Sequence, residues 1–122
     1  MSKKVKVPIS LIILELPPPD NAAYGQHGHI RYLTKKAKEW KEMVHFLGFQ
    51  LCIKPTEGKV KMRIRFYLKR ERDVQGSLKL LFDALEGIVY NNDKQVYSYS
   101  VKKFLDEESR KKPRIELKIE KL

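Results

Sequence analysis

A strictly alternating segment in the middle of the chain constrains the fold more than any other feature of this sequence. Every second residue from 60 to 68 is a large apolar one, and the residues between them are lysine, arginine and tyrosine. A period of two separates these sets onto opposite faces of a β-strand. We therefore predict a strand over residues 60–69 with one face in the core and one strongly basic face. The cations on that face repel one another unless DNA, or water and salt, supplies counterions.

Two helices are predicted from apolar residues that recur at spacings of three and four. The first begins after the N-cap Thr34, carries its apolar stripe on residues 33–47 and is expected to stop at Gly48. The second follows Asp73 and is expected to end at Gly87. Its buried stripe consists of Leu78, Leu81, Phe82 and Leu85.

The remaining patterns predict strands. Residues 9–16 form a nearly continuous apolar run, which indicates a strand buried on both faces in the middle of a sheet. Residues 30–33 are expected to form a short edge strand, and residues 96–104 and 114–122 form two more. The order β-(β)-α-β-α-β-β predicts an α+β fold, a small single domain over residues 1–122 with a mixed β-sheet and two helices.

The balance of charge favours a polyanionic partner. The chain has 26 Lys and Arg against 15 Asp and Glu, which gives a formal net charge of +11. Such a surplus attracts polyanions over a Debye length of about 10 Å, and nucleic acid is the commonest of them. A basic domain that is merely soluble, or one associated with the ribosome, is the alternative.

Two further features concern the compartment. No stretch approaches the roughly 18 apolar residues of a membrane helix, and the first residues do not resemble a signal peptide, so we expect a cytoplasmic protein with no membrane partner. The single cysteine, Cys52, cannot form an internal disulfide, which fits a reducing cytosol. Its apolar neighbours predict a buried thiol.

Candidate chemistry gathers around the second predicted helix. Asp73 and Asp93 are 20 residues apart and bracket it. If the flanking strands are neighbours, both carboxylates arrive at one end of the sheet. Carboxylates in a basic surface repel DNA phosphates unless a cation lies between them, and Mg²⁺, which prefers oxygen ligands, is such a cation. The helix adds one polar stripe, made of Gln75, Lys79, Asp83 and Glu86.

A competing interpretation gives these residues no chemistry. Lys79 and Asp83 are spaced as an ordinary i,i+4 ion pair, and Asp93 lies where a turn residue is expected. Spacing alone favours this interpretation.

Residues 72–96, RDVQGSLKLLFDALEGIVYNNDKQV, resemble the signature of the RusA family of Holliday junction resolvases. The family pattern runs D-x-D-N-x-x-K-x-x-x-D-x-L and, after a short gap, D-D-x-Q-[IV]. Residues 17–21, PPPDN, are similar to the family's proline-asparagine loop, and residues 31–35, RYLTK, resemble the lead into its first helix. The resemblance spans about residues 9–120, nearly the whole chain.

The resemblance implies a homodimeric, Mg²⁺-dependent endonuclease that resolves four-way DNA junctions by paired nicks in recombination and repair. Mn²⁺ is expected to substitute for Mg²⁺, and no small-molecule cofactor is implied. The catalytic residues carry over to Asp73, Gln75, Lys79 and Asp93, and the metal ligands to Asp73, Asp83 and Asp93. The residues expected to hold DNA are Arg63, Arg65, Lys69, Arg70, Arg72 and Asn21.

The chain departs from the family pattern at charged positions. Gln75 stands where the second motif aspartate belongs, Asn92 where the first aspartate of the D-D pair belongs, and Gly76 where the motif asparagine belongs. An amide oxygen can face a metal but lacks the charge that favours Mg²⁺ binding. Two hypotheses follow: a nuclease in which the remaining carboxylates suffice, or a catalytically weak or inactive RusA-like protein that binds junctions.

Overall fold

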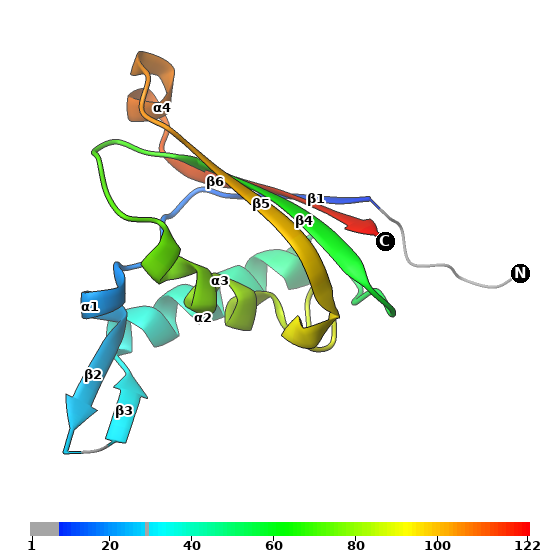
Figure 1. Cartoon of the computed structure of the whole chain (residues 1–122), viewed down its shortest axis with the longest axis horizontal. Coiled ribbons are helices and arrows are strands. Elements are labelled where there is room, and N and C mark those ends of the chain that lie inside the picture. Colours follow the sequence, from blue (N-terminus) through cyan, green and yellow to red (C-terminus); the bar gives the residue numbers. More distant parts are fainter. Residues whose placement is uncertain (1–7, 29) are drawn as a thin grey trace, which may run out of the picture.

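A four-stranded sheet with two main helices on one of its faces forms the body of the protein, and a small β-hairpin projects from it (Figure 1). The structure, a computed structural model, describes residues 8–28 and 30–122, without the side chains of Asp20 and Asn21. Along the chain the elements are β1 (Ile9–Ile13), α1 (Asp20–Ala23), β2 (Tyr24–His27), β3 (Ile30–Leu33), α2 (Lys35–Gln50), β4 (Val60–Tyr67), η1 (Gln75–Ser77), α3 (Leu78–Leu85), η2 (Asp93–Gln95), β5 (Val96–Phe104), α4 (Glu107–Lys111) and β6 (Arg114–Lys121).

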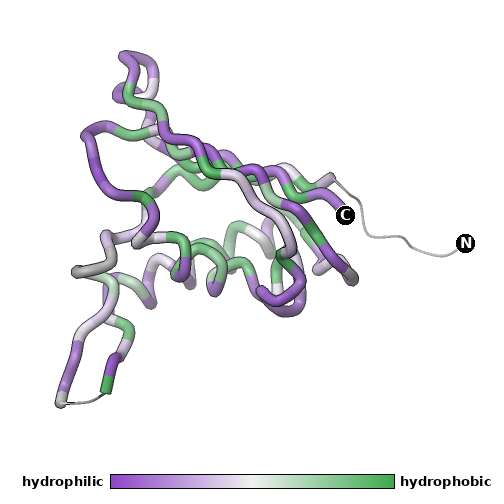
Figure 2. The backbone as a smooth tube through the Cα atoms, viewed as in Figure 1, coloured by the Kyte–Doolittle hydropathy of each residue, from purple (hydrophilic) through white to green (hydrophobic). Residues whose placement is uncertain are grey.

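The sheet is mixed, as the sequence predicts. Its strand order is β1-β6-β4-β5. β4 pairs antiparallel with β6 and parallel with β5, and β1 pairs antiparallel with β6. In Figure 2, hydrophilic residues dominate α4 and the loop after β4, while α2 and α3 carry hydrophobic stretches. The predicted α+β class is confirmed.

β4 has the two faces that its sequence predicts. Met62, Ile64 and Phe66 are each 1% exposed and belong to the core beneath α2 and α3. Arg63 and Arg65 alternate with them and are exposed. Because β4 lies between β5 and β6, both of its edges are paired, and its apolar face packs in the core with the helices.

The prediction for the first strand is wrong in two respects, its place in the sheet and the number of its buried faces. β1 lies at an edge of the sheet and buries only alternate residues, so that Ile12 is 51% exposed and Leu14, just beyond the strand, 64%. A continuous apolar run shows that either face of a strand can be buried, but it does not show whether other elements cover one face of that strand or both. Here the helices cover one face only.

α2 begins as predicted and runs further than predicted. Thr34 is its N-cap, and its hydroxyl accepts a hydrogen bond from the Ala37 N–H at 3.4 Å. Trp40 is buried, and its indole N–H donates to the Glu15 carbonyl at 2.8 Å. Gly48 does not stop the helix, which continues to Gln50. Its lack of a side chain instead allows Ile88 to approach, because an added Cβ would lie 2.4 Å from Ile88 Cγ2.

Cys52 is exposed, and the prediction of a buried thiol is wrong. The residue follows the end of α2 and has a φ of 55°, in the left-handed region. The chain turns here at the surface, so apolar neighbours in the sequence do not place the thiol in the core. The neighbouring Leu51 is also 54% exposed.

Two segments predicted as loops contain short elements. Residues 106–113 include α4, for which Asp106 is the N-cap and accepts hydrogen bonds from the Ser109 hydroxyl and N–H at 2.6 and 2.8 Å. These bonds lower the pKa of Asp106. The segment before β3 forms α1 and β2, and β2 pairs with β3 as a separate two-stranded sheet. None of the helices in the described ranges has the length and apolar character of a membrane span.

The contact between Gly48 and Ile88 is testable. We expect Gly48→Ala to destabilise the fold by about 1–3 kcal/mol, because the added methyl overpacks the interface between α2 and the turn after α3. Urea unfolding followed by the fluorescence of Trp40 measures the change. Gln50→Ala, at an exposed position of the same helix, is the control. In an Ile88→Ala background the Gly48→Ala step should cost less; a Gly48→Ala protein more stable than wild type would contradict the packing argument.

Candidate active site

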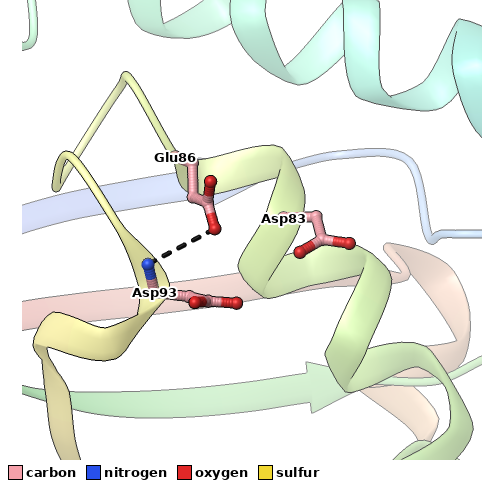
Figure 3. Close-up of side chains that lie close together, drawn as sticks. All are labelled: Asp83, Glu86 and Asp93. Atoms are coloured by element: carbon pink, nitrogen blue, oxygen red, sulfur yellow. Dashed lines mark hydrogen bonds between the residues drawn. The ribbon is translucent and has the colours of Figure 1, made fainter.

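Three carboxylates converge where α3 ends and η2 begins (Figure 3). Asp83 lies in the last turn of α3, Glu86 is its C-cap residue, and Asp93 is the first residue of η2. One carboxylate oxygen from each lies within 4.8 Å of the others, and all three residues are partly buried. Glu86 Oε1 also accepts a hydrogen bond from the Asp93 N–H at 3.3 Å. We call these three residues the acidic cluster.

A tight reversal of the chain brings the acidic cluster together. Gly87 has a φ of 80°, which a residue with a Cβ adopts only with strain, and it directly follows Glu86, the C-cap of α3. Its N–H donates to the Tyr90 carbonyl at 2.7 Å, which closes the turn. The prediction that Gly87 ends the helix is confirmed.

A capping box then fixes Asp93. The Asn92 side chain accepts from the Lys94 N–H at 2.8 Å, and the Gln95 side chain accepts from the Asn92 N–H at 2.9 Å. The Gln95 amide also donates to the carbonyls of Thr56 and Gly58 at 3.0 and 2.9 Å. Gln95 therefore ties the turn that carries Asp93 to the loop before β4.

Tyr90 forms the buried floor beneath the acidic cluster. Its ring is 0% exposed, and its hydroxyl donates to the Phe82 carbonyl at 2.7 Å. Burial raises the pKa of Tyr90 well above its usual value, and the charges of Asp93, Glu86 and Asp83 raise it further. The hydroxyl thus stays protonated and holds the turn against α3.

The electrostatics of the acidic cluster favour a cation. In the described part of the chain, no lysine or arginine forms an ion pair with any of its carboxylates. The cluster lies at the C-terminal end of α3, where the helix dipole adds negative potential. Two oxygens bound to one Mg²⁺ are at most about 4.2 Å apart, so small side-chain adjustments suffice. The donor set fits a hard divalent metal.

Asp73 and Gln75 lie in a different place. They line a pocket together with Val74, Leu78, Tyr99, Val101 and Lys103, and Asp73 Oδ1 accepts the Gln75 N–H at 2.9 Å. This pocket is at the N-terminal end of α3, a helix about 12 Å long. Tyr99, which lines this pocket, makes an edge-to-face contact with Phe82, with ring centroids 5.2 Å apart, and Phe82 directly precedes Asp83 of the acidic cluster.

The expectation that Asp73 and Asp93 meet at one end of the sheet is therefore wrong. The flanking strands β4 and β5 are neighbours, but they are parallel. The end of one parallel strand and the start of the next lie at opposite ends of the sheet. Of the predicted metal ligands, the structure brings Asp83 and Asp93 together, with Glu86 as the third carboxylate, and leaves Asp73 outside this set.

Lys79 faces away from the acidic cluster. Its Nζ lies 5.7 Å from the ring centroid of Tyr24 in the projecting hairpin, a cation–π arrangement. No ion pair joins Lys79 to Asp83 in the described residues, so the ordinary i,i+4 pair is not observed either.

The cations predicted to hold DNA are divided between surfaces. Arg63 and Arg65 lie on the sheet face opposite the helices, and Lys69 and Arg70 are exposed in the loop after β4. Arg72 is partly buried, and its guanidinium donates to the Ser77 hydroxyl at 2.9 Å. Burial lowers the pKa of Arg72, and the charge of Asp73 partly offsets that effect. The side chain of Asn21 lies outside the described part of the chain.

Comparison with protein families is decisive for the identity of this fold. A model of the family Endodeoxyribonuclease RusA matches residues 15–120. The chain belongs to the RusA endodeoxyribonuclease family. No individual curated protein matches the sequence.

The structure gives the two departures from the RusA motif different meanings. Asn92, in place of the first aspartate of the D-D pair, serves as the cap of η2, a role for which asparagine and aspartate are equally suited. Gln75 lies in the pocket beside Asp73 rather than in the acidic cluster. Neither substitution removes a carboxylate from Asp83, Glu86 and Asp93.

The positioning roles of Tyr90 and Gln95 were not predicted from the sequence. For Gln95 a local signal exists, because Asn92-x-x-Gln95 has the spacing of a capping box. In this chain, the residue at the glutamine of the RusA motif therefore has a structural role. The role of Tyr90 depends on a contact with Phe82 that no local pattern indicates.

Tyr90→Phe tests the floor of the acidic cluster. At pH 8 we expect the variant to be about 1 kcal/mol less stable, because the Phe82 carbonyl loses a buried partner. Above the ordinary tyrosine pKa of 10.0 the unfolded chain releases a proton that folded Tyr90 retains, so wild-type stability falls as pH rises. The gap between the proteins should narrow by up to about 1.4 kcal/mol per pH unit.

Denaturant unfolding at a series of pH values from 8 upwards measures this gap. Tyr97→Phe is the matched control, because the Tyr97 ring is 62% exposed. Parallel stability curves for wild type and Tyr90→Phe across this range would contradict the assigned pKa shift.

Proposed function

We propose that the chain is a structure-selective endodeoxyribonuclease that resolves four-way DNA junctions by Mg²⁺-dependent paired hydrolysis of phosphodiester bonds. Membership of the RusA family supports a deoxyribonuclease and a junction substrate. The observation that carries the proposal beyond the family is the acidic cluster, three carboxylates that pair with no lysine or arginine of the described residues, in a protein of net charge +11. A protein that only bound DNA would gain nothing from such a concentration of negative charge.

Asp83, Glu86 and Asp93 would hold the divalent metal. When bound, Mg²⁺ or Mn²⁺ polarises a phosphodiester and lowers the pKa of a bound water. Without a metal the cluster would repel the backbone that it has to approach. The Asp93 N–H bond to Glu86, with the Gln95 cap behind it, holds two of these carboxylates in place before DNA arrives.

Other charged residues would position the DNA backbone around this centre. Lys69 and Arg70 lie exposed in the loop that leads to the Asp73 pocket, and phosphate contacts of this kind hold DNA without reading its sequence. Asp73 and Gln75 remain proposed catalytic residues at the other end of α3, and Lys79 a proposed partner for charge that develops on the phosphate. Arg72 and Asn21 complete the proposed contacts around this centre, and Arg63 and Arg65 would contact DNA on the opposite face of the sheet.

A homodimer is part of the proposal. A four-way junction has two-fold symmetry, and paired nicks require two active sites related by a matching axis. Two copies of this chain supply two acidic clusters in that arrangement. The protein would act on DNA in the cytoplasm, where its single exposed cysteine stays reduced.

A second candidate function rests on Gln75 and Asn92. With two motif aspartates replaced, the chain could bind junctions and cut them poorly or not at all. The restoring variants Gln75→Asp and Asn92→Asp separate these functions, since Asn92→Asp keeps the cap of η2. A silent wild type that gains nicking when both positions are restored would establish the binding function.

Nicking of a labelled synthetic four-way junction with Mg²⁺ or Mn²⁺ tests the nuclease directly. We expect wild type to introduce paired nicks and Asp93→Asn to lose at least about 100-fold in rate, because a carboxylate charge is lost from the metal site. Asp73→Asn should also lose activity if the carried-over family role is right. Glu39→Gln, on the exposed face of α2, is the control. Junction binding by wild type without nicks would refute the nuclease.

Metal binding can be measured separately from catalysis. We expect Glu86→Gln to weaken Mn²⁺ binding, followed by electron paramagnetic resonance or calorimetry without DNA, by at least about tenfold, which is 1.4 kcal/mol. The acidic cluster predicts that Asp73→Asn leaves Mn²⁺ affinity near that of wild type. Loss of Mn²⁺ binding in Asp73→Asn with normal binding in Glu86→Gln would place the metal in the other pocket.

A further inference from the structure

The face of the sheet turned away from the helices carries an unusual excess of positive charge. The register places six cationic side chains on it: Lys61, Arg63, Arg65, Lys102, Arg114 and Lys118. Among the strand residues that the structure describes, only two carboxylates share this surface, those of Glu116 and Glu120. We call it the outer sheet face, and its charge from these residues is +4.

The ion pairs of the outer sheet face use some of its cations and leave three uncompensated. Glu120 lies 3.7 Å from Lys61 and 3.6 Å from Lys118, and Glu116 pairs with Arg114 at 2.8 Å. No carboxylate in the described residues forms an ion pair with Arg63, Arg65 or Lys102. These three lie side by side, because Arg65 pairs in register with Lys102 and follows Arg63 by one step on the same face.

The dimensions of the outer sheet face suit a polyanion with a long, regular backbone. β4 has eight residues, which span about 26 Å. A DNA duplex carries one negative charge per roughly 1.7 Å of its axis, so a length of this order presents about 15 phosphates. Ser10, Arg63, Arg65, Glu116 and Lys118 also line a depression in this face.

The outer sheet face and the acidic cluster point in different directions. Arg63 and Arg65 alternate along β4 with Met62, Ile64 and Phe66, which pack against the helices. The acidic cluster belongs to the helical layer, at the end of α3 (Figures 1 and 3). The core of the protein therefore lies between the two, and a duplex laid along the outer sheet face does not bring its phosphates to the cluster.

We propose that the outer sheet face is a second duplex-binding surface, which holds an arm of branched DNA other than the arm at the acidic cluster. The proposal rests on the proposed function for the branched substrate, and on charge complementarity for the duplex. A linear duplex fills one surface at a time, whereas a junction offers arms to both. This gives the protein a physical basis for preferring branched DNA, because the second arm binds at a high effective concentration once the first is held.

Counting duplexes per protomer tests the second surface without any cutting. The probe is a linear duplex of about ten base pairs, roughly one helical turn, titrated at low salt and protein concentrations above the dissociation constant. We expect wild type to bind two duplexes per protomer and Arg63→Ser with Arg65→Ser to bind one. The control, Lys35→Ser with Lys38→Ser, removes two exposed charges from α2 and should still bind two. One duplex per wild-type protomer, or two in the Arg63/Arg65 variant, would overturn the proposal.

A junction then reports whether the two surfaces act together. We expect the Arg63/Arg65 variant to lose at least about tenfold more affinity for a four-way junction than for the linear duplex, because it loses the second arm as well as the charge. Equal losses on both DNAs would mean that one surface serves both and would also overturn the proposal. Thermal unfolding confirms that each variant is folded. The duplex count and the junction affinity do not depend on hydrolysis, so the proposed nuclease function is tested separately, by nicking of the junction by wild type.

Discussion

The parallel pairing of β4 with β5 is the constraint on which the rest of the structure depends. Antiparallel neighbours can be joined by a short turn, but parallel neighbours require the chain to return along the whole sheet before the next strand begins. That return is made through α3, which packs its apolar stripe over the core and leaves its polar residues at the margin. The entire RusA motif, residues 72–96, lies in this crossover. Both candidate sites are consequently placed by one connection, one at each end of the helix.

Side-chain and backbone contacts tie the end of the crossover, residues 87–95, to its surroundings. In this segment Gly87 reverses the chain, Tyr90 anchors it to α3, and Gln95 joins it to the loop before β4. These contacts fix the backbone of Asp93 relative to Asp83 and Glu86. A metal centre needs its ligands held in place by their surroundings, because each side chain ordered at binding weakens the affinity. Asp73, by contrast, is exposed and held by a single bond to the next residue but one.

The sequence was sufficient for the elements in which one residue pattern corresponds to one physical environment. The alternation in β4 fits only a strand with one buried face, and the stripe in α3 fits only a helix with one buried side, so both were predicted. β1 was misplaced because a continuous apolar run fits an edge strand as well as a central one. The pairing of Asp73 with Asp93 was mispredicted for a different reason: it required the flanking strands to be antiparallel as well as neighbours, and β5 is a neighbour of β4 but parallel to it. Whether two neighbouring strands are parallel or antiparallel depends on the path of the chain between them, and the local composition of the strands does not indicate that path.

The separation of charge in this protein is the arrangement that the proposed metal centre requires. A lysine or arginine beside Asp83, Glu86 and Asp93 would neutralise them and compete with a divalent ion for their oxygens. Lys79, one turn before Asp83 on α3, lies over Tyr24, and Lys103, which lines the Asp73 pocket at the other end of the helix, pairs with Glu71. A DNA-binding protein that must protect carboxylates from its own cations has to carry the free ones on another surface. Arg63 and Arg65, across the core from the acidic cluster, satisfy that requirement, so the alternation that defines β4 also keeps the two kinds of charge apart.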